Sequence, residues 1–138
     1  MNHTIHHGDC LDVMPTLAPG SVDLIVCDPP YGTMKGAELD TWDAMTTQWD
    51  IAIEPETLFA ACERVLRVNG ALVLFAQEPY TSSLITQAHN NLPFSYRLVW
   101  EKEHFGNPLT AKKAPASYFE DVLVFFKKYE TNLRCPLR

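Results

Sequence analysis

The sequence has no long hydrophobic run. No apolar stretch in its 138 residues approaches the roughly 18 residues that a membrane-spanning helix needs. The first residues, Met1-Asn2-His3-Thr4, are polar and are not followed by the apolar segment of a secretory signal. We therefore expect a cytoplasmic protein with no membrane contact.

Paired metal-ligand motifs are also missing. The cysteines, Cys10, Cys27, Cys62 and Cys135, form no Cys-x-x-Cys pair and have no paired histidine spacing beside them. We expect no metal site, and we interpret the three cysteines that lie in apolar surroundings as core thiols.

Basic side chains are scarce, because the chain has 11 Lys and Arg residues and 17 Asp and Glu residues. The imbalance is uneven: residues 1–96 carry 3 basic and 12 acidic side chains, net −9, whereas residues 97–138 carry 8 basic and 5 acidic, net +3. The C-terminal basic residues could contact nucleic-acid phosphates or could form an ordinary solvated surface. They are Arg97, Lys102, Lys112, Lys113, Lys127, Lys128, Arg134 and Arg138.

Strand and helix patterns alternate along the chain. The length suits one domain, residues 1–138, with one core. The alternation predicts an α/β fold with a doubly wound, mostly parallel sheet. Strands are expected at residues 4–7, 22–27, 71–76, 94–100 and 122–126, helices at 11–17, from Pro55 to a stop at Asn69-Gly70 and at 80–89, and long loops at 32–50 and 104–117.

The most informative motif is Asp28-Pro29-Pro30-Tyr31, directly after the apolar segment 22–27. Open α/β sheets bind ligands at the carboxyl ends of their strands. Each proline fixes its own φ and holds the preceding residue extended. The Asp28 carboxylate and the Pro29 carbonyl are then two acceptors presented together, and they could hold the two N–H groups of an exocyclic amine. Tyr31 offers a face for stacking a base that has left its duplex.

With these residues the sequence resembles the amino-methylating DNA methyltransferases, in particular the permuted, phage-type members whose catalytic half comes first. The resemblance spans nearly the whole chain. It rests on Gly8-Asp9-Cys10-Leu11, residues 21–25, Asp28 to Gly32, Trp49-Asp50, residues 69–75, Val99 to Lys102, Ala111 to Lys113 and Glu120 to Phe125.

The resemblance implies a methyltransferase-type sheet with an antiparallel last strand and an S-adenosylmethionine-dependent transfer of a methyl group to the 6-amino group of a flipped adenine in DNA. Asp28, Pro29, Pro30 and Tyr31 would be catalytic. Asp9, Cys10 and Asp28 would contact the cofactor, although Asp9 equally suits a helix N-cap. DNA contacts are expected at Lys102, Lys112, Lys113 and Trp49, with residues 104–117 forming the substrate-side loop.

The Phe-x-Gly-x-Gly loop that holds the cofactor in this family is absent, because no two of the six glycines are separated by a single residue. The cofactor half would then be incomplete, and a second chain or another copy could complete it. Two alternatives therefore remain: a non-catalytic DNA-binding remnant or subunit, and an enzyme with another acceptor. That acceptor could be the 4-amino group of cytosine, RNA or a glutamine side chain.

Overall fold

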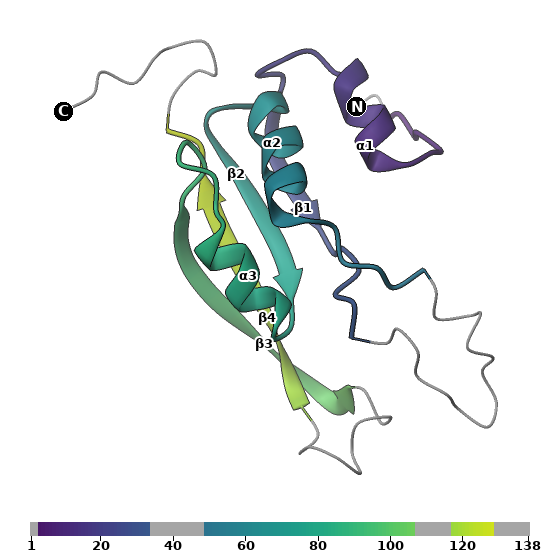
Figure 1. The fold of residues 1–138 in the computed structure, drawn as a ribbon, viewed down its shortest axis with the longest axis vertical. Coiled ribbons are helices and arrows are strands. Elements are labelled where there is room, and N and C mark those ends of the chain that lie inside the picture. The colour runs from purple at the N-terminus through teal and green to yellow at the C-terminus, as the bar shows by residue number, and fades with distance from the viewer. Residues whose placement is uncertain (1–2, 34–48, 107–116, 129–138) are drawn as a thin grey trace.

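The computed structural model of the chain contains one mixed four-stranded sheet with helices packed against it (Figure 1). It describes residues 3–33, 49–106 and 117–128. The elements, in chain order, are α1 (Cys10–Val13), a 3₁₀ turn (Met14–Thr16), β1 (Val22–Cys27), α2 (Pro55–Val65), β2 (Leu66–Ala76), α3 (Tyr80–Thr86), β3 (Phe94–Gly106) and β4 (Ser117–Phe126).

The strand order in the sheet is β1-β2-β4-β3. β1 and β2 are parallel, and β4 is antiparallel to both β2 and β3. Three strands therefore run in one direction and the last strand in the opposite direction, so the predicted antiparallel last strand is confirmed.

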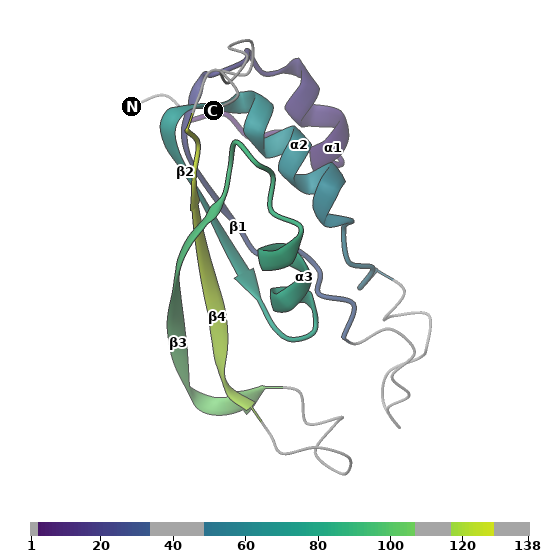
Figure 2. The same cartoon turned by 60° about the vertical axis from the view of Figure 1, so that its left-hand side comes forward.

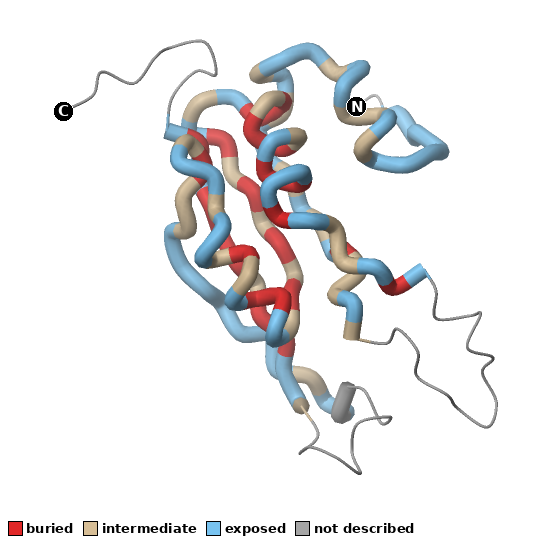
Figure 3. The backbone as a smooth tube through the Cα atoms, viewed as in Figure 1, coloured by how far each residue is buried: buried red, intermediate tan, exposed pale blue. Residues whose placement is uncertain are grey.

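The described helices lie on one side of the sheet (Figure 2). Phe59 of α2 and Leu84 of α3 belong to one buried cluster with Leu72 and Leu74 of β2. Because successive side chains of a strand point to opposite faces, alternate β2 residues face this core, and buried and half-buried residues alternate along β2 in Figure 3.

The opposite side of the sheet is apolar and exposed. We call it the open face. The second helical layer of a doubly wound sheet is not among the residues that the structure describes. The open face includes Leu24 and Val26 of β1, Tyr96, Leu98 and Trp100 of β3 and Phe126 of β4, each between 39% and 60% exposed.

Several predicted boundaries differ from the structure. Residues 4–7 are not a strand. The helix that was expected to end at Asn69-Gly70 ends at Val65, and β2 begins at Leu66. α3 is shorter than predicted, whereas β3 and β4 are longer and include both ends of the expected loop 104–117.

The Asn69-Gly70 pair marks an irregularity within β2 instead of a helix end. Asn69 has a positive φ of 61°, and the pairing of β1 with β2 shifts register between Val22 and Leu24. A Cβ on Gly70 would lie 2.8 Å from the Arg67 carbonyl oxygen and 3.1 Å from that of Asp23. Glycine is thus required where two backbones approach closely.

Candidate functional site

The Asp28-Pro29-Pro30-Tyr31 segment lies where the sequence predicted it, at the carboxyl end of β1. Cys27, the last residue of β1, is paired with Leu74, and β2 ends two residues later at Ala76. The segment therefore lies at the edge of the sheet where the parallel strands end, which is the usual position of ligand sites in open α/β sheets.

A hydrogen bond within the segment fixes the aromatic ring. The Tyr31 hydroxyl donates to Asp28 Oδ1 at 2.5 Å. Burial is the main cause that raises the pKa of Tyr31 above its ordinary value. The hydrogen bond to Asp28 and the negative charges of Glu120 and Asp28 raise this pKa further. The phenol therefore stays protonated and occupies one oxygen of Asp28. The sequence analysis did not anticipate this bond.

Asp50 anchors the turn that follows. Its Oδ1 accepts a hydrogen bond of 2.9 Å from the backbone N–H of Gly32, and only 3% of Asp50 is exposed. Gly32 has a φ of +74°, which favours glycine. Sequence reasoning assigned Asp50 no role, and the only signal for it was its place beside Trp49 in the Trp49-Asp50 pair.

The Asp28-Pro29-Pro30-Tyr31 segment and the residues around Asp50 line an open pocket of about 250 Å³, which we call the Asp28 pocket. Trp49, 63% exposed, contributes an indole surface to it. The structure thus brings together the four predicted catalytic residues and one predicted DNA-binding residue. The lining residues are Asp28, Pro29, Pro30, Tyr31, Thr33, Trp49 and Asp50.

Asp9 and Cys10 lie at the start of α1. Asp9 Oδ1 accepts a hydrogen bond from the Leu11 N–H at 2.8 Å, so Asp9 is an N-cap, as the second interpretation of the sequence held. Burial raises the pKa of the Cys27 thiol, and charge on Cys10 and on Asp28 adds to the shift.

Six of the eight basic residues that suggested phosphate contacts fall into three groups. Lys102 forms an ion pair with Glu120 and lies over the Trp100 ring, 5.0 Å from its centroid. Lys127 is 1% exposed and donates to the carbonyls of Glu63 and Leu66, so its suggested phosphate contact is wrong. Lys112, Lys113, Arg134 and Arg138 lie outside the described residues.

Two classes of site are not found. In the part of the chain that the structure describes, no group of three or more His, Cys, Asp or Glu side chains could hold a metal ion. Among the described helices, none has the length and apolar character to span a bilayer.

Known proteins are similar to this chain in sequence. A family model described as DNA methylase matches residues 22–135. The DNA adenine methyltransferase YhdJ of Escherichia coli (strain K12) is 30% identical over 127 residues, which are 90% of this chain and 41% of YhdJ.

Solved structures share the fold at low sequence identity. A DNA modification methylase of Thermus thermophilus matches with a TM-score of 0.65 at 18% identity, over 99% of this chain and 58% of that one. The complex of M1.HpyAVI with SAM has a TM-score of 0.62 at 18% identity and covers 93% and 55% of the two chains. The cytosine-N4-specific PvuII DNA methyltransferase has a TM-score of 0.57 at 14% identity, with 88% and 48% covered. The chain thus spans about half the length of these proteins, and the comparison confirms a methyltransferase-type fold.

Proposed function

This chain belongs to the DNA methylase family whose model matches residues 22–135, and from that membership we propose that it contributes the base-binding half of a DNA adenine methyltransferase. The observation that carries the proposal is the Asp28 pocket. In it, a carboxylate, two prolines, a tyrosine and an exposed tryptophan meet at the carboxyl edge of the sheet.

The chemistry follows from these groups. The amine of adenine is a poor nucleophile because its lone pair is delocalised into the ring. The free oxygen of Asp28 and the Pro29 carbonyl would accept its two N–H bonds, favour a pyramidal nitrogen and stabilise the positive charge that develops during methyl transfer. The hydrogen bond from Tyr31 to Asp28 holds the ring against which the base would stack.

The proposed target base must be outside its duplex, because a paired base cannot enter the Asp28 pocket. Tyr31 and Trp49 line that pocket together and would hold the flipped base. Base-to-aromatic stacking contributes about 1–3 kcal/mol per base, which helps to offset the loss of stacking in the duplex.

S-adenosylmethionine is the proposed methyl donor. Asp9, Cys10 and Asp28 are all exposed, and the two carboxylates could accept hydrogen bonds from hydroxyl or amino groups of a cofactor. These residues therefore fit the edge of a cofactor site. Calorimetric titration with S-adenosylmethionine at millimolar concentration tests the assignment, because an absence of heat would contradict cofactor binding by this chain.

Adenine is preferred to cytosine as the acceptor because YhdJ, the 30%-identical relative, is an adenine methyltransferase. The cytosine-N4-specific PvuII enzyme supports the second candidate, but it is similar only in fold. A non-catalytic DNA-binding role, alone or beside a second chain, is the third.

Mass spectrometry of DNA nucleosides distinguishes the candidates. Unmethylated DNA is incubated with the chain and S-adenosylmethionine and is then hydrolysed. N6-methyladenine that disappears in Asp28→Ala supports the proposal, and N4-methylcytosine supports the second candidate. The formation of neither product, although the chain binds DNA, supports the third. The control is Asp23→Asn, which changes an exposed carboxylate that pairs with Arg67 in β2.

A further inference from the structure

Residues 49–54, which we call the bridging segment, connect the Asp28 pocket to the helical side of the sheet. They form no helix or strand and lead directly into α2. The beginning of the segment lines the Asp28 pocket. Near its end, the Ile53 carbonyl accepts a hydrogen bond of 2.7 Å from the hydroxyl of Tyr80 in α3. Only 4% of Tyr80 is exposed, so this bond ties the bridging segment to the buried core.

Asp50 is the central residue of a tight turn in the bridging segment. The Ile51 N–H donates to the Trp49 carbonyl at 2.9 Å, which closes a three-residue turn around Asp50. Asp50 Oδ1 accepts a hydrogen bond of 2.9 Å from the Gly32 N–H, and only 3% of Asp50 is exposed. A hydrogen bond to a carboxylate is roughly twice as strong as one between neutral groups. One buried side chain thus joins the turn that carries Trp49 to the turn that follows Tyr31.

Tyr31 needs such support because two pockets border it. It lines the Asp28 pocket and also a pocket of about 310 Å³ between the bridging segment and α3. Among the described residues, Tyr31 is the one lining residue that the two pockets share. Packing against the core therefore holds only part of the ring. Hydrogen bonds hold the rest: the hydroxyl is bonded to Asp28, and the backbone next to the ring is bonded to Asp50 through Gly32.

A displaced Tyr31 would disturb the groups that are proposed to grip the base. Its hydroxyl occupies one oxygen of Asp28, so movement of the ring would let the carboxylate rotate away from an incoming amine. The indole of Trp49 would lose its fixed position relative to Tyr31. Displacement of a reacting group by about 1 Å can cost about a hundredfold in rate, so the position of these groups matters.

We infer that Asp50 is a positioning residue of the Asp28 pocket. It fixes Tyr31 and Trp49 relative to each other and, through Tyr31, keeps Asp28 turned toward the amine of the base. Because it is buried, Asp50 acts through Gly32 and not by contact with the base. The inference rests on the proposed function, because it requires that the Asp28 pocket binds adenine.

Binding of two labelled single-stranded oligonucleotides tests the inference without a cofactor. One consists of thymine alone, and the other carries a single central adenine. Fluorescence anisotropy gives a Kd for each, and the ratio of the two Kd values is the adenine preference. Unfolded chain weakens both apparent affinities equally, so the ratio does not depend on the folded fraction. We expect about tenfold for wild type, as one good base contact allows, and nearly onefold for Asp28→Ala.

Three variants examine the bonds of the bridging segment. Asp50→Ala should lower the adenine preference to below about threefold, because the pocket groups lose their fixed positions. Asp50→Asn should keep most of the preference, because its amide oxygen can still accept from the Gly32 N–H. Tyr80→Phe releases the Ile53 carbonyl and should lower the preference to about fivefold, as the loss of one hydrogen bond allows.

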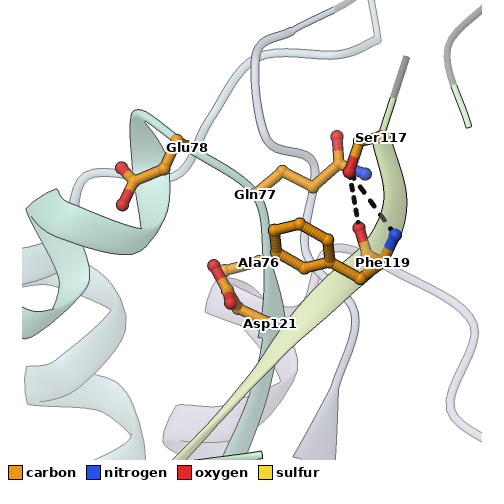
Figure 4. A pocket seen from close by; sticks show the side chains of 6 residues that line it. All are labelled: Ala76, Gln77, Glu78, Ser117, Phe119 and Asp121. Carbon is orange, nitrogen blue, oxygen red and sulfur yellow. Dashed lines mark hydrogen bonds between the residues drawn. The ribbon is translucent and has the colours of Figure 1, made fainter. Parts of the chain in front are cut away.

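Thr81→Val is the matched control for Tyr80→Phe. The two residues are neighbours in α3, both are buried, and each variant loses one hydroxyl hydrogen bond. The Thr81 hydroxyl donates to Asp121 Oδ2 at 2.8 Å. Asp121 lies in β4 beside Ala76, at the end of β2, and does not line the Asp28 pocket (Figure 4). We expect Thr81→Val to lower the melting temperature and to keep the full adenine preference.

The outcomes distinguish the inference from the proposed function. A preference that Asp28→Ala removes and Asp50→Ala leaves intact overturns the inference and leaves the proposed function in place. Equal losses in Asp50→Ala and Asp50→Asn also overturn it, because the bond to Gly32 would not be the cause. A wild-type chain without an adenine preference overturns the inference, and the proposed function falls as well if N6-methyladenine is not formed. If Asp50→Ala does not fold, a preference in Tyr80→Phe as high as in Thr81→Val overturns the inference.

Discussion

At the scale of single residues, the hydrogen bonds made by the side chains of Asp28 and Asp50 shape the candidate site. Asp28 accepts from the Tyr31 hydroxyl and Asp50 from the Gly32 N–H. The motif could be read from the sequence because its prolines have a strong local effect. Asp50 could not, because it lies 18 residues from its partner Gly32.

Gly32 permits the turn that brings Asp50 against the segment. Its φ of +74° is a left-handed conformation, which costs about 1–2 kcal/mol for a residue with a Cβ. We expect Gly32→Ala to lower the free energy of unfolding by that amount in urea titrations. The control is Gly8→Ala, where a Cβ would meet only Val13 Cγ2, at 3.5 Å. Equal stability losses in the two variants would show that the conformation of Gly32 does not matter.

Cys62 predicts a loss of stability at alkaline pH. Burial raises the pKa of its thiol from the ordinary 9.0 to about 12. The folded state therefore favours the neutral thiol, and its contribution is complete below about pH 9 and is lost as the pH rises towards 12.

We expect the free energy of unfolding to fall by about 2 kcal/mol between about pH 8 and pH 10.5 through this group. Tyr80 adds to the loss, because burial raises its pKa to about 12 as well. Cys62→Ala should show a smaller fall in urea titrations at the two pH values. A fall as large as in wild type would rule out Cys62 as a source of the alkaline instability.

At the scale of elements, Lys127 joins β4 to the end of α2. Its Nζ donates to the carbonyls of Glu63 and Leu66 at 2.7 and 2.8 Å and lies 3.4 Å from Glu63 Oε1. The last carbonyls of a helix have no partner within the helix, so a lysine there satisfies acceptors that would otherwise be buried without a bond. This element contact explains why a lysine that suggested DNA binding in the sequence is a structural residue.

Removing this lysine should destabilise the whole sheet. We expect Lys127→Met to lower the free energy of unfolding by about 3 kcal/mol, because the carboxylate of Glu63 and two carbonyls would remain buried without the ammonium group. Lys128→Met, at the exposed neighbouring position, should change stability by less than about 0.5 kcal/mol. Urea titration of both variants measures the difference, and similar stabilities would refute the role assigned to Lys127.

At the scale of the whole molecule, the two sides of the sheet differ, because no described helix covers the open face. One side of the sheet packs on helices, while large apolar side chains on the other side are about half-exposed. Contiguous exposed apolar surface is uncommon on monomeric proteins and favours association. We therefore expect the 138-residue chain by itself to self-associate through this face.

Sedimentation at increasing concentration measures the association. We expect the double variant Leu24→Thr/Leu98→Thr, in which two exposed leucines of the open face become polar, to associate at least about tenfold more weakly than wild type. Threonine preserves strand propensity, so the fold should be kept. The matched control is Ile51→Thr, an exposed apolar residue that belongs to no helix or strand. A wild-type chain that stays monomeric at high micromolar concentration would contradict the prediction.

Features that depend on neighbouring residues could be read from the sequence. The bounds of β1 were predicted correctly, because an apolar run followed by two prolines leaves little choice, and the Asp28 segment was placed at the correct strand end. The alternation of elements likewise predicted the fold class.

Features that depend on distant pairings emerged only in the folded molecule. β2 begins at Leu66 because pairing with β1 extends it across Asn69-Gly70, which local propensity reads as a helix end. Lys127 is buried because α2 presents carbonyls to it, and Asp121 has a buried oxygen without a hydrogen bond because β4 lies between β2 and β3. Composition and local spacing do not predict such contacts, because each contact joins residues that come together only when the sheet forms.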